Sequence, residues 1–143
     1  MLRGACSLRP GVSTVRTPII LSLAVIVPLG VLAKLYTGWY GDWVNNSASG
    51  ILYEVFWCLA LFLVWPRRAA IRRIVIGVFL VTCGLEVLQL WHPSWLGAFR
   101  STVAGRTLIG TTFAWSDFAY YAIGCGVGWL WLRWLARRGP DAP

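Results

Sequence analysis

Two polar residues lie one helical turn apart inside a segment that is otherwise apolar enough to cross a membrane. The segment LVTCGLEVLQLW, residues 80 to 91, contains Glu86 and Gln89. A carboxylic acid in such surroundings can act as a general acid or base. It also costs free energy to place there, and the macrodipole disfavours an anion near the C-terminus of a helix. Glu86 is therefore expected to have a partner.

Other side chains near the same predicted end of the helices could complete a polar site around Glu86. Arg100 is the first choice of cation because it follows the segment closely, and Arg106 is the second. The expected binding residues are Asp42, Glu86, Gln89, Arg100, Asp117 and Tyr121, and the candidates for acid–base catalysis are Glu86, Asp117 and Glu54. Glu54 and Glu86 are expected at similar depths, roughly 7 to 10 Å below the outer helix ends.

Each of the other acids also has a simpler explanation. Glu54 and Asp117 lie near predicted helix N-termini, where free backbone N–H groups favour an anion. Asp42 is equally explained as a hydrated residue in the turn GWYGDW. An ion-pair cluster that only fixes the register of the helices remains an alternative for the whole set.

The spacing of the last apolar segment predicts which face of it packs inward. Tyr121, Gly124 and Gly128 follow Asp117 by 4, 7 and 11 residues, so all four share one helical stripe. Glycines four residues apart allow two helices to approach closely. We expect this stripe to face the interior of a bundle.

The four cysteines and the single histidine do not form a metal-binding pattern. No CxxC motif or Cys/His spacing typical of a metal site is present. The cysteines inside the apolar segments are expected to be small buried side chains, and neither a metal nor a cofactor is expected.

The composition predicts the elements that must position these residues. Of the 143 residues, 58% are hydrophobic and only 13% are charged, which is typical of an integral membrane protein. Four continuous apolar segments indicate an all-α bundle of four transmembrane helices, at about 18–36, 49–65, 71–91 and 117–135. Residues 92–116, between the third and fourth helices, are expected to lie at the membrane interface or to re-enter the membrane.

The basic residues predict how this bundle is oriented. Ten fall on one predicted side: Arg3, Arg9, Arg16, Arg67, Arg68, Arg72, Arg73, Arg133, Arg137 and Arg138. The positive-inside rule then places both termini in the cytoplasm. The net charge of +8 is explained by topology and by contact with anionic lipid, so no nucleic acid is expected as a partner. The predicted organisation is a basic cytoplasmic tail at 1–16, a single domain at 17–138 and a short tail at 139–143.

Three stretches of the sequence together resemble a known family. They are GDW at 41–43, then Glu86, Gln89 and Leu90, and then FRSTVAGRTLIGTTFAWSDFAYYAIG at 99–124. They are similar to an uncharacterised bacterial membrane family known as domain of unknown function 2809. The resemblance implies a multi-pass protein of the bacterial inner membrane with a shared polar site, and no established reaction.

A looser resemblance connects the chain to VanZ-like proteins, which are small helical membrane proteins. It rests on Glu86, Gln89, Arg100, Asp117, Gly124 and Gly128. Tyr121 departs from the VanZ-like pattern, and so does the first outer loop, which lacks the usual histidine. The drug resistance associated with one member of that group is therefore not carried over to this chain.

Three classes of function follow from these observations. The first is a binding protein whose outward-facing polar pocket holds a membrane lipid or a lipid-linked precursor of the cell envelope. The second is an intramembrane enzyme acting on such a substrate, with Glu86 as the acid or base. The third is a purely structural charge cluster or a small transporter, and a homodimer is left open throughout.

Overall fold

The structure is a computed structural model that describes residues 11–90, 98, 101–102 and 114–137. Every regular element among these residues is helical, which confirms the all-α prediction for the described part of the chain. Most of the segment expected at the interface, 92–116, lies outside the described residues. Arg100 and Arg106 are among the residues that lie outside.

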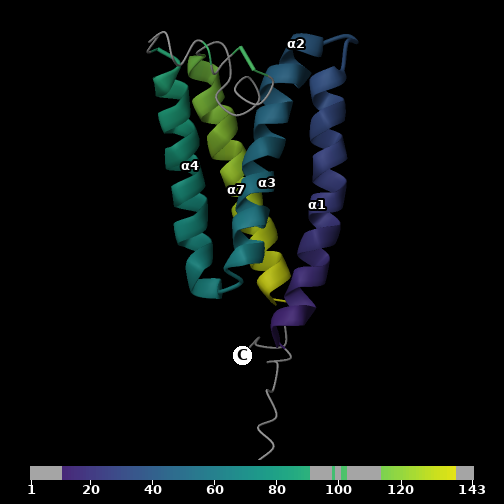
Figure 1. Ribbon diagram of the computed structural model, residues 1–143, viewed down its shortest axis with the longest axis vertical. Coiled ribbons are helices and arrows are strands. Elements are labelled where there is room, and N and C mark those ends of the chain that lie inside the picture. The colour runs from purple at the N-terminus through teal and green to yellow at the C-terminus, as the bar shows by residue number, and fades with distance from the viewer. Residues whose placement is uncertain (1–10, 91–97, 99–100, 103–113, 138–143) are drawn as a thin grey trace, which may run out of the picture.

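Four long helices form the bundle (Figure 1). They are α1, Gly11–Leu35; α3, Ser49–Val64; α4, Ile71–Leu88; and α7, Trp115–Arg137. Short elements connect them: α2, Gly41–Trp43; a π-helical turn η1, Val44–Ala48; and a 3₁₀ turn η2, Arg68–Ala70. Helix α1 starts within the expected N-terminal tail, because the helix continues on the N-terminal side of Pro18.

Two helical segments are long and apolar enough to cross a membrane, Arg16–Leu35 and Gly41–Val64. Helix α4 is more polar, since Arg72, Arg73 and Glu86 all lie within its 18 residues. Length and composition therefore support two of the four expected spans directly.

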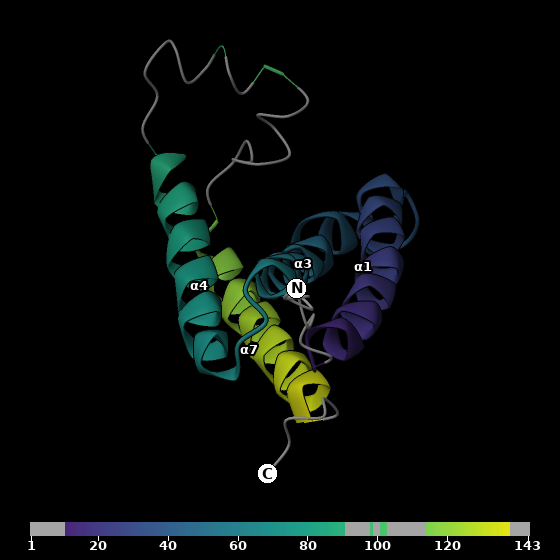
Figure 2. The same cartoon turned by 60° about the horizontal axis from the view of Figure 1, so that its bottom comes forward.

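Helix α3 lies at the centre and contacts the three other long helices (Figures 1 and 2). Helix α1 packs on α3, and α4 packs against both α3 and α7. Figure 1 shows that α1 begins and α7 ends at the same end of the bundle. The buried side chains of α3 follow the spacing of one helical face: Val55, Cys58, Leu59 and Phe62.

The second apolar segment is helical well before the expected start at Ser49. Helix α2, η1 and α3 run without a break from Gly41 to Val64, a stretch of 24 residues. Before it, Tyr40 adopts a left-handed backbone conformation with φ of 61°, which turns the chain into α2. The Ser49 hydroxyl donates to the carbonyl groups of Asn45 and Asn46 in the π-helical turn. The polar residues 41–49 are therefore the first part of a helix and not a loop.

This earlier start changes the position of Glu54. Glu54 is now about 20 Å from Gly41, the first residue of its helical segment, at 1.5 Å per residue. Glu86 is two residues from the end of α4. Glu54 therefore lies further from the start of its helical segment than the sequence predicted, and Glu86 lies closer to the end of its own helix.

Candidate functional site

Glu86 belongs to the same buried face of α4 as the apolar core. This face has the spacing of one helical stripe and consists of Ile71, Ile74, Val78, Thr82 and Glu86. Only 1% of the Glu86 surface is exposed. Because Glu86 lies on the same helical stripe as the buried apolar residues of α4, its carboxylate also lies in the interior.

Three donors surround the carboxylate of Glu86. Oε2 accepts hydrogen bonds from Gln89 Nε2 at 2.8 Å and from Tyr121 Oη at 3.0 Å. Oε1 accepts a hydrogen bond from the backbone N–H of Ala114 at 3.0 Å. Three of the expected residues, Glu86, Gln89 and Tyr121, are thus brought together, and the contacts join α4 to α7.

The backbone contact explains how Glu86 is tolerated close to the C-terminus of its own helix. Ala114 immediately precedes α7, and its carbonyl accepts the first bond of that helix, from the N–H of Asp117 at 3.0 Å. Glu86 therefore lies at the positive end of the α7 dipole and satisfies one of the N–H groups there. The sequence predicted Arg100 as the cation, which lies outside the described residues, and Gln89 and Tyr121 as further binding residues, which contact Glu86 as expected. Among the described residues the partners are two uncharged side chains and a helix N-terminus.

A second buried acid, Glu54, lies deeper in the bundle. Its exposed fraction is 0%, and its Oε2 accepts a hydrogen bond from Cys125 Sγ at 3.1 Å. Within the described part of the chain, Glu54 Oε1 has no hydrogen-bond partner. Glu54 packs against Gly124, one helical turn along α7 from Tyr121, which binds Glu86. The two acids therefore lie on neighbouring turns of the bundle and accept hydrogen bonds from different donors among the described residues.

Two glycines let α7 approach α3 closely enough to enclose Glu54. A Cβ atom at Gly124 would lie 2.7 Å from Glu54 Cβ, and one at Gly128 would lie 3.0 Å from Cys58 Cβ. Both helices thus use residues four apart at their contact, as in close packing of membrane helices. Gly124 and Gly128 of the predicted stripe thus face α3, as expected, whereas Asp117 lies on the partly exposed first turn of α7. Sequence analysis missed the role of Cys125, because nothing in the sequence indicates which residue a buried thiol will contact.

The two remaining acids lie apart from Glu86. Asp117 accepts a hydrogen bond from Ser116 Oγ at 3.3 Å on the partly exposed first turn of α7. Asp42 is exposed in α2. Of the predicted set, Asp42 is exposed, Asp117 is partly exposed at the start of α7, and Arg100 lies outside the described residues.

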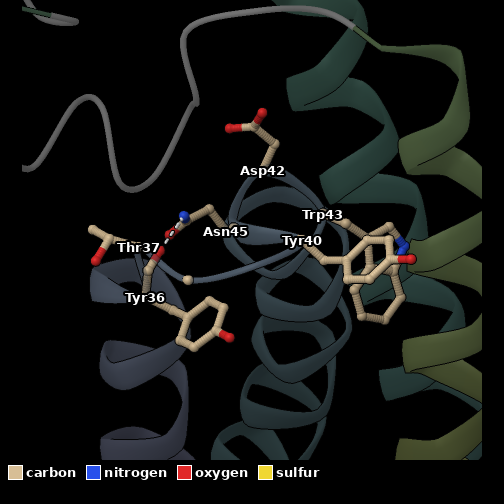
Figure 3. Close-up of a pocket in the computed structure, with 8 residues that line it drawn as sticks. Tyr36, Thr37, Tyr40, Asp42, Trp43 and Asn45 are labelled. Carbon is tan, nitrogen blue, oxygen red and sulfur yellow. Dashed lines mark hydrogen bonds between the residues drawn. The ribbon is translucent and has the colours of Figure 1, made fainter.

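Asp42 lies in a pocket between the end of α1 and the start of α2 (Figure 3). The pocket has a volume of about 620 Å³ and is lined by Tyr36, Thr37, Gly38, Tyr40, Gly41, Asp42, Trp43 and Asn45. Figure 3 shows the Asn45 amide directed at the backbone of Tyr36, to which Asn45 Nδ2 donates a hydrogen bond of 2.8 Å. The buried Oδ1 atom of Asn45 has no hydrogen-bond partner in the described part of the chain. Because the protein encloses Asn45 Oδ1, the acidic acceptor that the pocket offers is the exposed Asp42 carboxylate.

A contact with α7 fixes one side of this pocket. Trp43 Nε1 donates a hydrogen bond of 3.0 Å to Tyr120 Oη, and the two rings meet edge to face at 6.4 Å between centroids. Such a pair combines aromatic packing with a satisfied indole N–H. Sequence analysis included Asp42 in the candidate site, but it did not predict that Tyr36 and Asn45 meet beside it, since their contact depends on the turn at Tyr40.

The comparisons with known proteins identify one family to which the chain is similar. No solved structure matches the chain. A family model described as "Protein of unknown function (DUF2809)" matches residues 39–125, which is more than half of the chain and includes Asp42, Glu54 and the Glu86 contacts. The looser resemblance to VanZ-like proteins stays a prediction. The chain therefore belongs to the DUF2809 family.

Proposed function

We propose that the chain is a four-span protein of the bacterial inner membrane that binds the headgroup of a lipid, or of a lipid-linked envelope component, in the pocket between α1 and α2. In this proposal both termini are cytoplasmic and the pocket faces outward. Its support comes from the distribution of charge, from the level of the pocket in the bundle and from the chemistry of the pocket lining.

The charged residues separate between the two ends of the bundle. The end where α1 begins and α7 ends carries exposed arginines: Arg16, Arg67, Arg68, Arg72, Arg73, Arg133 and Arg137. The opposite end carries Asp42 and Asp117 together with a single described basic residue, Lys34. The positive-inside rule assigns the arginine-rich end to the cytoplasm, so the pocket belongs to the outer leaflet.

The pocket lies where a membrane places its headgroups. It is formed at the outer end of the two most apolar helical segments, and Tyr36, Tyr40 and Trp43 line it. Tyrosine and tryptophan favour the interface between hydrocarbon and water. Lipid headgroups would therefore contact this pocket more often than other molecules.

The observation that carries the proposal is the exposed Asp42 carboxylate in a pocket lined by Tyr36, Tyr40 and Trp43. A carboxylate forms its strongest hydrogen bonds with cationic donors. The pocket therefore favours a headgroup that carries an ammonium group.

In this proposal Glu86 supports the bundle and does not contact the ligand. Its carboxylate already accepts three hydrogen bonds, and it is almost fully buried. A general acid or base must reach the reacting group directly or through one water molecule. The geometry therefore favours a structural role for Glu86 over the acid–base role considered from sequence.

Native mass spectrometry of the detergent-purified protein with added phosphatidylethanolamine tests the proposal. We expect wild type to retain the lipid and Asp42→Asn to bind it about tenfold more weakly, corresponding to loss of roughly 1.4 kcal/mol of binding free energy. Asp117→Asn is the matched control, because it removes the same charge at the same end outside the pocket. Equal binding by wild type and Asp42→Asn would overturn the assignment.

A further inference from the structure

The end of the bundle opposite the pocket carries a dense group of arginines on two neighbouring segments. This basic face consists of Arg67, Arg68, Arg72, Arg73, Arg133 and Arg137, and all six are exposed. The acidic residues that the structure describes lie elsewhere: Asp42, Glu54, Glu86 and Asp117. The positive charge of this face is therefore not balanced by carboxylates of the described chain.

The two segments meet in space. Arg68, in the η2 turn before α4, donates a hydrogen bond to the carbonyl of Ala136 near the end of α7. Helices α4 and α7 also pack against each other directly. The arginines of the first turn of α4 and those of the last turns of α7 thus contribute to one surface and not to two separate ones.

The local backbone adds to the positive potential. Helix α4 begins here with Ala70 as its N-cap residue, which has no side-chain capping bond, and its first turn contains no acidic residue. The positive end of the α4 dipole therefore points into the basic face. The N-terminus of α4 and the Arg72 and Arg73 side chains in its first turn are all positive. A bound anion would lower the repulsion among these positive charges.

Two features identify the anion as phosphate at a membrane surface. The six cationic residues are all arginine, whose planar guanidinium group binds phosphate oxygens in pairs, whereas lysine acts as a point charge. Trp65 is 61% exposed at the end of α3, and Arg133 stacks over the Trp129 ring at 4.6 Å. Exposed tryptophan with arginine is typical of the headgroup level of a bilayer.

We propose that this basic face binds the phosphate groups of anionic phospholipids in the cytoplasmic leaflet, at the junction of the η2 turn, the first turn of α4 and the last turns of α7. The site is separate from the outward-facing pocket. It does not depend on the ligand proposed for that pocket, and it gives the bundle a preference for anionic lipid on one side.

Native mass spectrometry with added phosphatidylglycerol or phosphatidylcholine tests this site. We expect wild type to prefer phosphatidylglycerol, and Arg72→Gln/Arg73→Gln to bind it about thirtyfold more weakly, since each arginine near an anionic surface contributes roughly 1 kcal/mol. Arg16→Gln/Lys34→Gln is the matched control because it removes two charges outside the basic face. Because Arg16 lies at the same end of the bundle and Lys34 at the opposite end, we expect a loss of at most about fivefold.

The outcomes separate this site from general charge and from the pocket. Equal loss of phosphatidylglycerol binding in both double variants would overturn the proposal, because total charge would then explain the effect. Equal binding of the two lipids by wild type would overturn it without any variant, so a misfolded variant cannot hide the answer. Asp42→Asn should leave phosphatidylglycerol binding unchanged, whereas it should weaken binding in the outward-facing pocket.

Discussion

Tyr121 on α7 donates a hydrogen bond of 3.0 Å to the buried carboxylate of Glu86 on α4, across a separation of 35 residues in the sequence. The same carboxylate also accepts the backbone N–H of Ala114, immediately before α7. Glu86 therefore holds the start of α7 at two points. This arrangement gives a buried acid a structural role and predicts how individual substitutions will change stability.

Tyr121→Phe should destabilise the bundle by about 1.5–3 kcal/mol, because it removes a donor from a buried charged acceptor. The loss can be measured by chemical denaturation in detergent, followed by circular dichroism. Tyr120→Phe is the control, since its hydroxyl accepts an exposed hydrogen bond from Trp43. We expect that control to lose less than about 1 kcal/mol, and equal losses in the two variants would contradict the assignment.

Gly124→Ala should destabilise the contact between α3 and α7 by about 1–3 kcal/mol, the usual cost of overpacking. A Cβ atom at Gly124 would lie 2.7 Å from Glu54 Cβ and 2.8 Å from the carbonyl oxygen of Ile51. Gly126→Ala is the control, since a Cβ atom there meets nothing within 4 Å. Thermal unfolding should show a lower midpoint for the first variant only. The second gains helix propensity and should be more stable by up to about 1 kcal/mol.

Glu54→Gln should leave stability unchanged or raise it. The substitution keeps the size of the side chain and an acceptor for Cys125, and it removes an acid from a site where one oxygen has no partner within the described residues. Burying an ionisable group without compensation is costly, so its neutral isostere is expected to be tolerated. Unfolding of the purified protein checks this, and a loss above about 2 kcal/mol would show that the acid itself is needed for folding.

Cysteine labelling in intact cells tests the proposed orientation. In a cysteine-free background, Asp42→Cys should react with a membrane-impermeant maleimide, since Asp42 is exposed at the proposed outer end. Arg137→Cys, at the end of α7, should react only after the cells are permeabilised. The positive-inside rule gives this result its physical basis. The reverse labelling pattern would contradict the topology.

Part of this architecture could be predicted from the sequence because it depends on local spacing. The three-residue separation of Glu86 and Gln89 places both side chains on one helical face, and their hydrogen bond of 2.8 Å follows from that. The glycine stripe on α7 follows from the same periodicity. Such features require only that each segment is helical.

The rest could not be predicted because it depends on how distant segments meet. The polar stretch GDWVNNSAS lacks the apolar periodicity of a membrane helix, yet it is helical through a π-helical turn to which Ser49 donates hydrogen bonds. The N–H group that Ala114 offers to Glu86 is a backbone contact, which side-chain chemistry in the sequence does not reveal. Sequence analysis therefore predicted the acid and two of its donors, Gln89 and Tyr121, and missed the backbone N–H of Ala114.

The central claim is that Glu86 supports the bundle while the ligand binds beside Asp42. Thermal unfolding and native mass spectrometry on Glu86→Gln and Asp42→Asn, with phosphatidylethanolamine added, test it in one comparison. Glu86→Gln should lose about 1–3 kcal/mol of stability, because the amide presents a donor to groups that donate. The Glu86→Gln protein that remains folded should still bind the lipid. Asp42→Asn should have the same unfolding midpoint as wild type and should lose the lipid. Loss of the lipid from folded Glu86→Gln, with full binding retained by Asp42→Asn, would contradict the account.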